Sequence, residues 1–266
     1  MALAPGPIHD PNCGSWVNAG YRGWPGRDSD IYCNYIANCW DDGIEAEGAG
    51  QNVRIWNNYI ENTMMTIANA AVSIGPLYIW RNVGGRSYSP PGSKWNLTHG
   101  NFMKMGFAGS DTWMTGHMYV FNNTIFQGKD DAANGLGGEG RMIKHCVTRN
   151  NLLQCRSTDT HSISTDTKGS VDNDFDYDLL SGRYPDGQEK HGIKGAPKYV
   201  PGAGFSFETK TGNFQQAPDS PGFHKALVIP NFCEGAAPDM GAQEAGTPPM
   251  VVGVKAEFIP PAAPKK

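Results

Sequence analysis

The stretch Asp30–Asn38 reads DIYCNYIAN, and the stretch Arg54–Asn62 repeats the same phrase as RIWNNYIEN. A third copy begins at Tyr78 with YIWRNV, and two more follow after longer insertions. The equivalent asparagines of the five copies, of which the first three are equally spaced, are Asn34, Asn58, Asn82, Asn123 and Asn151. Self-similarity at a period of roughly 20 to 50 residues is typical of repeat architectures, so the sequence indicates a tandem repeat.

Apolar residues recur in register around these asparagines, and Ile31, Ile55 and Ile79 each stand three positions before one. Each copy contains short alternating runs separated by Asn and Gly turns, without the period of about 3.6 residues that marks a helix. One copy cannot bury its own apolar face. Copies stacked at the inter-strand spacing of about 4.8 Å bury isoleucine on isoleucine and let each asparagine amide bond the next. The repeat therefore predicts an all-β fold, a parallel β-helix or β-solenoid.

The composition changes on both sides of the repeat. We expect residues 1–28, rich in Gly, Pro, Asn and Trp, to form an irregular segment that covers the first rung, because an open sheet edge invites pairing with other chains. The rungs are expected over 29–182, a C-terminal β-helix turn and loop region over 183–245, and an extended Pro-rich tail over 246–266.

Composition and charge exclude several classes of protein. The 266 residues carry 22 Lys and Arg against 26 Asp and Glu, a net charge of −4, so the chain lacks the basic excess that binds nucleic acid. No apolar run approaches the roughly 20 residues of a membrane span, and Met1–Ile8 lacks the features of a signal peptide. The six cysteines include no Cys-x-x-Cys pair, which disfavours a zinc knuckle and leaves disulfides open.

The repeat phrases resemble those of right-handed parallel β-helix proteins, the pectate-lyase-like, polysaccharide-active family in its bacterial extracellular form. The similarity covers Asp30–Gly182 and includes the phrases WDDGIEAEG, GPLYIWRNV, FMKMG and DYDLL. Ser220–Glu244 is similar to a common ending of such proteins and departs from it at Phe223, His224 and Lys225. The resemblance implies a right-handed β-helix, an extracellular location and action on polysaccharides as a lyase, glycosidase, epimerase or tailspike. It also implies a capping helix and more rungs, so we expect this chain to be short for its class or the C-terminal part of a longer one.

The first candidate site is an acidic cluster in CWDDGIEAEG, formed by Asp41, Asp42, Glu45 and Glu47. If Ile44 faces the core, Glu45 and Glu47 lie on the outer face of one strand, about 6.6 Å apart along it. Catalytic carboxylates are about 5 to 5.5 Å apart in retaining glycosidases and about 6.5 to 9.5 Å in inverting ones, so one could be the acid and the other the base or nucleophile. The same four carboxylates could hold Ca²⁺. Alternatively, they serve only the solubility of a solvated strand face.

Lys104 in FMKMG is the second candidate, because Met103 and Met105 would take the core side and direct Lys104 outward. It could act as the base of a lyase or pair with a sugar acid, or it could simply be solvated. A third group is similar to phrases of polygalacturonase-like β-helices, but its spacing differs and no roles carry over; it consists of Glu139, Arg141, Lys144 and His145. The histidines that stand isolated in the sequence, expected to be surface or hydrogen-bonded residues, are His99, His117 and His161.

A column of outward-facing aromatic residues precedes the ladder asparagines, and the candidates for substrate binding are Tyr32, Trp56, Tyr78, Trp80, Tyr119 and Phe121, followed by Arg149. Exposed rings could stack on sugar faces; alternatively, the N-terminal segment, the tail or a second subunit covers them. The sequence thus predicts an extracellular polysaccharide-active protein, with hydrolysis by the acidic cluster ahead of β-elimination by Lys104. A non-catalytic carbohydrate-binding or tailspike-like module, as a homo-oligomer or a piece of a larger chain, is the alternative.

Overall fold

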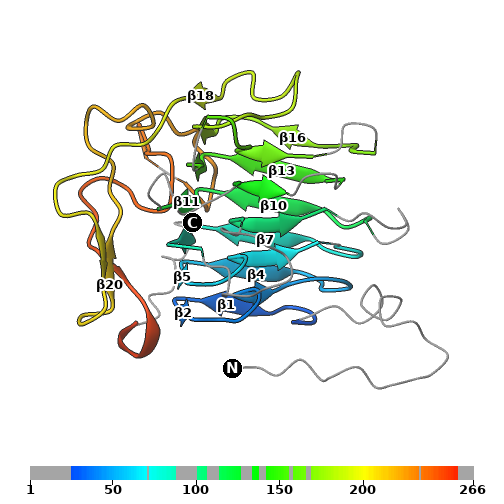
Figure 1. Cartoon of the computed structure of the whole chain (residues 1–266), viewed down its shortest axis with the longest axis horizontal. Coiled ribbons are helices and arrows are strands. Elements are labelled where there is room, and N and C mark those ends of the chain that lie inside the picture. The colour runs from blue at the N-terminus through cyan, green and yellow to red at the C-terminus, as the bar shows by residue number, and fades with distance from the viewer. Residues whose placement is uncertain are drawn as a thin grey trace, which may run out of the picture.

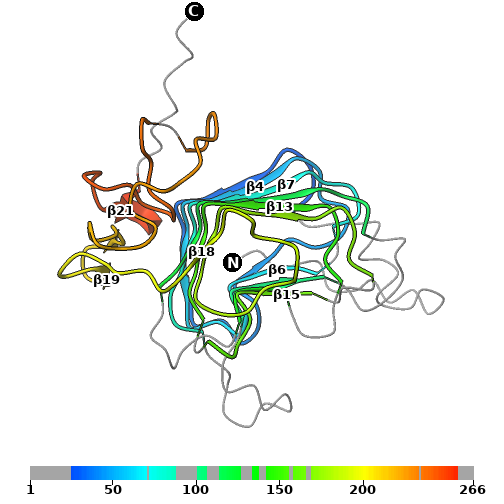
Figure 2. The same cartoon turned by 90° about the horizontal axis from the view of Figure 1, so that it is seen from above.

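The computed structural model describes residues 25–70, 72–87, 101–106, 114–126, 134–137, 142–155, 158–165, 169–233 and 235–256. Three parallel sheets of six, seven and five strands run along the stack, and each of the first five described turns of the chain contributes one strand to each of them (Figures 1 and 2). The prediction of an all-β parallel β-helix is confirmed. Within the described ranges the one helical segment is the 3₁₀ turn η2, Gly253–Lys255, and no helix has the length and apolar character that crossing a lipid bilayer requires.

The first sheet contains β1 (Asp30–Tyr32), β4 (Val53–Trp56), β7 (Leu77–Trp80), β10 (Met118–Phe121), β13 (Cys146–Arg149) and β16 (Asp174–Phe175). The second sheet contains β2 (Tyr35–Ala37), β5 (Tyr59–Glu61), β8 (Val83–Gly84), β11 (Thr124–Ile125), β14 (Leu152–Leu153), β17 (Leu179–Leu180) and β18 (Ile193–Lys194). The third sheet contains β3 (Ile44–Glu45), β6 (Ile67–Asn69), β9 (Met103–Met105), β12 (Leu136–Gly137) and β15 (Ile163–Ser164).

The core follows from the register of the repeat. Ile31 pairs with Ile55, and Ile55 pairs with Ile79, so identical side chains stack along the helix axis. In β4 and β7 buried and half-buried residues alternate, which places one face of the first sheet in the core and the other outside. Side chains such as Ile60 and Ile67 fill the space between the three sheets and are fully buried. Each rung therefore buries its apolar face against its neighbours, as the repeat predicts.

The asparagine ladder forms at the bend between the first and second sheets. The Nδ2 of Asn34 donates to Oδ1 of Asn58 at 3.0 Å, and the same bond recurs upward through Asn82, Asn123 and Asn151 at 2.9, 3.1 and 2.9 Å. The last amide donates at 2.8 Å to Oδ1 of Asp178, a sixth ladder residue that the sequence pattern did not identify. The ladder thus ends on a buried carboxyl group, and the backbone N–H of Asp178 donates to Oε2 of Glu189 at 3.2 Å.

The C-terminal region forms a small antiparallel sheet beside the solenoid, with strands β19 (Gly204–Ser206), β20 (Thr211–Asn213) and β21 (Met250–Val251). It lies against the second sheet (Figure 2), where Phe214 and Met250 pack with Tyr59. Strand β21 lies within the range expected to form an extended tail, so part of that range is ordered. Directly after it, the Gly253 N–H donates to the Cys33 carbonyl at 2.7 Å, which joins the C-terminal region to the first rung.

Some expectations fall outside the described residues. Almost all of the expected N-terminal cover, residues 1–24, lies there, as does the last part of the tail, 257–266. Cys13 also lies outside, whereas the five described cysteines are free thiols, namely Cys33, Cys39, Cys146, Cys155 and Cys233.

Candidate functional site

Charged side chains gather on the outer face of the third sheet, over its first three strands. Glu45 on β3, Ala68 on β6 and Lys104 on β9 occupy one register position on successive rungs. Because Ala68 is small, the Lys104 side chain can extend across the middle rung to carboxylates of the rung below. The alternation of β9, with Met103 and Met105 buried and Lys104 half-buried, directs the lysine to this face.

Asp42 lies in the turn before β3, and its side chain is fully buried. The Nζ of Lys104 donates to Oδ2 of Asp42 at 2.6 Å and lies 3.2 Å from Oε1 of Glu47. The other Asp42 oxygen, Oδ1, is buried without a hydrogen-bond partner. The turn requires glycine at position 43, because a Cβ on Gly43 would lie 2.7 Å from the Ile60 side chain. The fold thus fixes a desolvated carboxylate that lacks one donor.

Glu45 is hydrogen-bonded to the Asp42 carboxyl group and is the donor when it is protonated. Desolvation, followed by the charge of Glu47, raises the pKa of Glu45 to about 7; the Lys104 charge opposes this shift, and a hydrogen bond to Asp42 adds to it. Burial also raises the pKa of Asp42, although the charge of Lys104 opposes the rise. Glu45 is nonetheless exposed at the surface, so its proton can reach a bound molecule. Near neutral pH the site therefore presents one transferable proton beside two carboxylates.

Lys104 is the cation of this group. Burial lowers its pKa, but the charges of Glu47 and Asp42 outweigh burial and raise the pKa above the ordinary value. The ammonium group thus stays protonated and holds two carboxylates on one side of the strand. This arrangement differs from that of a lyase base, which must be neutral before it can accept a proton.

The structure brings together Asp42, Glu45, Glu47 and Lys104, whereas Asp41 is exposed at the margin and acts on Asp42 only through its charge. The four carboxylates do not form a group whose ligand atoms all converge within 4.8 Å; the described residues that do so lie elsewhere. Lys104 already occupies the position between Asp42 and Glu47 that a cation would need. The Ca²⁺ site expected at the acidic cluster is therefore not supported.

Trp40, which is not among the predicted site residues, directly precedes the acidic run in the sequence. Its side chain is 75% exposed and lies two positions before Asp42. A large exposed apolar side chain is costly at a surface unless it is covered or takes part in binding. The signal in the sequence is an aromatic residue directly before an acidic run, outside the column of aromatic residues that precedes the ladder asparagines.

The aromatic column of the first sheet is built differently from a binding platform. The rings of Tyr32 and Trp56 stack at 4.6 Å with planes 5° apart, and those of Trp56 and Trp80 stack at 5.5 Å and 10°. Tyr78 and Tyr119 stack in the same way at 5.1 Å and 15°. The rings therefore cover one another's faces along the axis. A sugar ring stacks on an aromatic face rather than on an edge, so this column is poorly suited to the predicted role.

The C-terminal region covers the upper part of the column. Phe232 meets Trp80 and Phe121 edge-on, each at 5.3 Å, and stacks loosely on Tyr78 at 6.2 Å. Arg81 fastens this cover, because its guanidinium donates to the Phe232 carbonyl at 3.3 Å. Phe121 is buried as a result. The last predicted position, Arg149, is ion-paired with Asp174.

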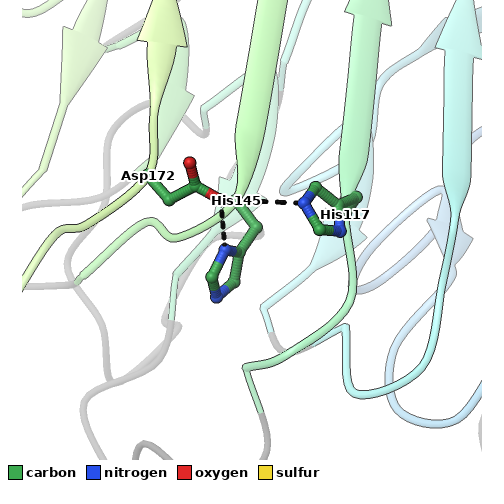
Figure 3. A group of neighbouring side chains, drawn as sticks. All are labelled: His117, His145 and Asp172. Atoms are coloured by element: carbon green, nitrogen blue, oxygen red, sulfur yellow. Dashed lines mark hydrogen bonds and ion pairs between the residues drawn. The ribbon is translucent and has the colours of Figure 1, made fainter.

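The third predicted group is only partly described, since Glu139 and Arg141 lie outside the described residues, as does His99. Lys144 is buried. His145 converges with His117 and Asp172 (Figure 3). His117, which is isolated in the sequence, is exposed, as expected of a surface residue, and lies 3.6 Å from Asp172. A search with models of known protein families and a search of curated protein sequences each returned no match.

Proposed function

We propose that this protein is a polysaccharide-active β-helix enzyme of the pectate-lyase-like type, a glycoside hydrolase with Glu45 and Glu47 as its acid and base. The observation that carries the proposal is the difference in surroundings between two neighbouring carboxyl groups, Glu45 on β3 and Glu47 two positions further along the chain. Glu45 holds its proton up to about pH 7, whereas Glu47 is ion-paired with Lys104. Glycosidases depend on such a difference between two neighbouring carboxyl groups.

The two residues have complementary roles in this mechanism. Glu45 donates its proton to the glycosidic oxygen as the bond to the anomeric carbon breaks. Glu47 accepts a proton from the water whose oxygen forms the new bond to that carbon. Residues two apart on a strand are separated by about 6.6 Å, within the range of about 6.5 to 9.5 Å that leaves room for a water in inverting enzymes.

Asp42 and Lys104 position this pair. Asp42 is buried and hydrogen-bonds the protonated Glu45, so it favours the acid form before catalysis. Lys104 neutralises part of the negative charge and holds Glu47 in place. Because both roles require a charged ammonium group, hydrolysis fits the geometry better than β-elimination with Lys104 as base.

Trp40 and the resemblance of the repeat to polysaccharide-active proteins support a carbohydrate substrate. The exposed Trp40 directly precedes the acidic run in the chain, and a flat aromatic ring can stack on a sugar face. A polysaccharide substrate agrees with the extracellular location that the resemblance implies, and the net charge of −4 disfavours nucleic acid as a partner.

The test is a screen of the purified chain against neutral and uronic polysaccharides that follows reducing ends and the absorbance of unsaturated uronates together. We expect new reducing ends without the unsaturated chromophore. Glu45→Gln should lower this rate by about 10²-fold or more, as loss of a general acid does. The control Asp219→Asn, at an exposed carboxylate 2.7 Å from Lys198, should leave it unchanged.

Three outcomes contradict the proposal. If both signals rise together, the protein is a lyase. Retention of full hydrolytic activity in Glu45→Gln would show that the acid lies elsewhere. Silence on every substrate, together with retardation by one polymer in an affinity gel, would identify a carbohydrate-binding module; in that case Trp40→Ala should abolish the retardation.

A further inference from the structure

A second polar cluster lies at the start of three successive strands of the first sheet. His117 directly precedes β10, His145 directly precedes β13, and Asp172 stands two positions before β16. The register pairs Met118 with Cys146 and Val147 with Asp174, which places the three side chains in one column. Each of them stands six positions before the ladder residue of its own rung. The solenoid repeat therefore brings them together.

Their donor atoms converge. Nδ1 of His145 lies 2.7 Å from Oδ2 of Asp172, and Nε2 of His117 lies 3.6 Å from the same oxygen. The ligand atoms of the three residues all lie within 4.8 Å of one another, and the side chains face one another in Figure 3. The two imidazole planes are tilted by 46°, with ring centres 5.2 Å apart, so the rings are not simply stacked.

We propose that His117, His145 and Asp172 bind a divalent transition metal ion, Zn²⁺ in the first instance. Imidazole nitrogen and carboxylate oxygen bind Zn²⁺ at about 2.0 to 2.2 Å, which places neighbouring ligand atoms of a tetrahedron about 3.3 to 3.5 Å apart. The distances of 2.7 and 3.6 Å bracket that value, so small side-chain rotations suffice. Two nitrogen donors favour Zn²⁺ or a similar ion over Ca²⁺ and Mg²⁺, which prefer oxygen.

The backbone holds this column in place, while solvent reaches the ligands. The N–H of His145 donates to the Val171 carbonyl at 3.1 Å, and the N–H of Met118 donates to the His145 carbonyl at 2.9 Å. The side chains of His117, His145 and Asp172 are 53, 25 and 66% exposed. Three protein ligands at an open surface leave the fourth position of the metal to water, as in catalytic rather than structural zinc sites.

The test is calorimetric titration of ZnCl₂ into the full chain after treatment with EDTA. We expect one equivalent to bind, and we expect His117→Asn, His145→Asn and Asp172→Asn each to weaken binding by about 10-fold or more. His191→Asn is the matched control, because Nδ1 of His191 lies 2.7 Å from Oδ2 of Asp176 in a similar His–Asp pair that forms no such three-residue group with the other described residues. Circular dichroism and melting temperature establish that each variant is folded.

Co²⁺ provides a second readout, since a tetrahedral site with nitrogen and oxygen ligands gives a visible absorption band without the intense ultraviolet band of a thiolate. The proposal would be overturned if all three variants bound zinc with the affinity of the parent chain, or if the parent chain did not bind zinc at millimolar ZnCl₂. A thiolate band that disappears in Cys33→Ser or Cys39→Ser would do the same, because it would place the metal on the free cysteines. Glu45→Gln should bind zinc like the parent chain, so the result is independent of the hydrolase proposal.

Discussion

Glu189 accepts a hydrogen bond from the backbone N–H of Asp178, and the two carboxyl groups close the upper end of the asparagine ladder. Burial raises the pKa of Asp178 to about 6 and, together with the Asp178 charge, raises the pKa of Glu189 to about 10. At neutral pH the pair therefore retains a proton that the unfolded chain would release.

This proton makes stability depend on pH. Because the folded pKa of Glu189 lies above the ordinary value of 4.5, its contribution is complete below that value and is lost as the pH rises toward 10. Glu189→Gln keeps a hydrogen-bond donor at this position and removes the carboxyl group that titrates. We expect its melting temperature to exceed that of the parent by roughly 5 °C at pH 9, about 2 kcal/mol for a domain of this size, and to match it at pH 5. Parallel pH profiles for the two proteins would refute this, and the exposed Glu208→Gln is the control.

The middle of the ladder should be sensitive to truncation. Asn123 accepts from the side chain of Asn82 and donates to that of Asn151, all three being fully buried. In Asn123→Ala both neighbours lose a partner away from water, which should lower the free energy of unfolding by about 3 kcal/mol or more. Urea denaturation measures this change. Asn52→Gly removes an exposed hydrogen bond to Asp28 at a residue whose positive φ glycine tolerates, so it should cost less than about 1 kcal/mol. Equal losses in the two variants would contradict the predicted sensitivity of the buried ladder.

The titration of Glu45 can be measured without a substrate. Carboxyl ¹³C NMR should show a midpoint of about 7 in the parent chain. The positive charge of Lys104 lowers the pKa of Glu45, so Lys104→Met should move the midpoint upward, whereas Lys198→Met should not. If hydrolysis needs protonated Glu45, its rate in the parent chain should decline as the pH rises through about 7. In Lys104→Met the pH of this decline should shift upward together with the Glu45 midpoint. A midpoint near 4.5 in the parent would exclude the proposed acid.

Phe232 should control the exposure of the aromatic column. Phe232→Ala removes its edge contacts to Trp80 and Phe121, so tryptophan emission should shift to longer wavelength and become easier to quench with acrylamide. We expect a loss of about 1 to 2 kcal/mol in unfolding free energy for a half-buried ring. Phe207→Ala, at a side chain that is 55% exposed, should leave the emission unchanged. The same emission in both variants would mean that Phe232 does not shield the column.

The features predictable from the sequence are those that recur within one repeat or one strand. The period of the asparagines was enough to predict the stack, and the alternation around Ile44 was enough to place Glu45 and Glu47 on the outer face. The place of Asp178 in the ladder does not follow from the asparagine repeat, because an acid replaces the amide there. Its acceptor oxygen nevertheless does the same work as an asparagine carbonyl.

Contacts between rungs were harder to predict, because insertions of unequal length separate the partners. Lys104 meets Asp42 across 62 residues, and Arg81 meets the Phe232 carbonyl across 151. The cluster of His117, His145 and Asp172 could have been found by counting back six positions from each ladder residue. That count requires Asp178 to be recognised as a ladder member first.

The bond from Gly253 to Cys33 changes how this solenoid should come apart. In an ordinary repeat array each unit touches only its neighbours, so terminal units can fray without disturbing the rest. Here a strap from the end of the described chain returns past the whole stack and is anchored on the first rung. The lowest turn can therefore peel away only if the strap is released as well, which ties both ends of the array into one cooperative unit and makes its assembly depend on a contact formed over a long loop.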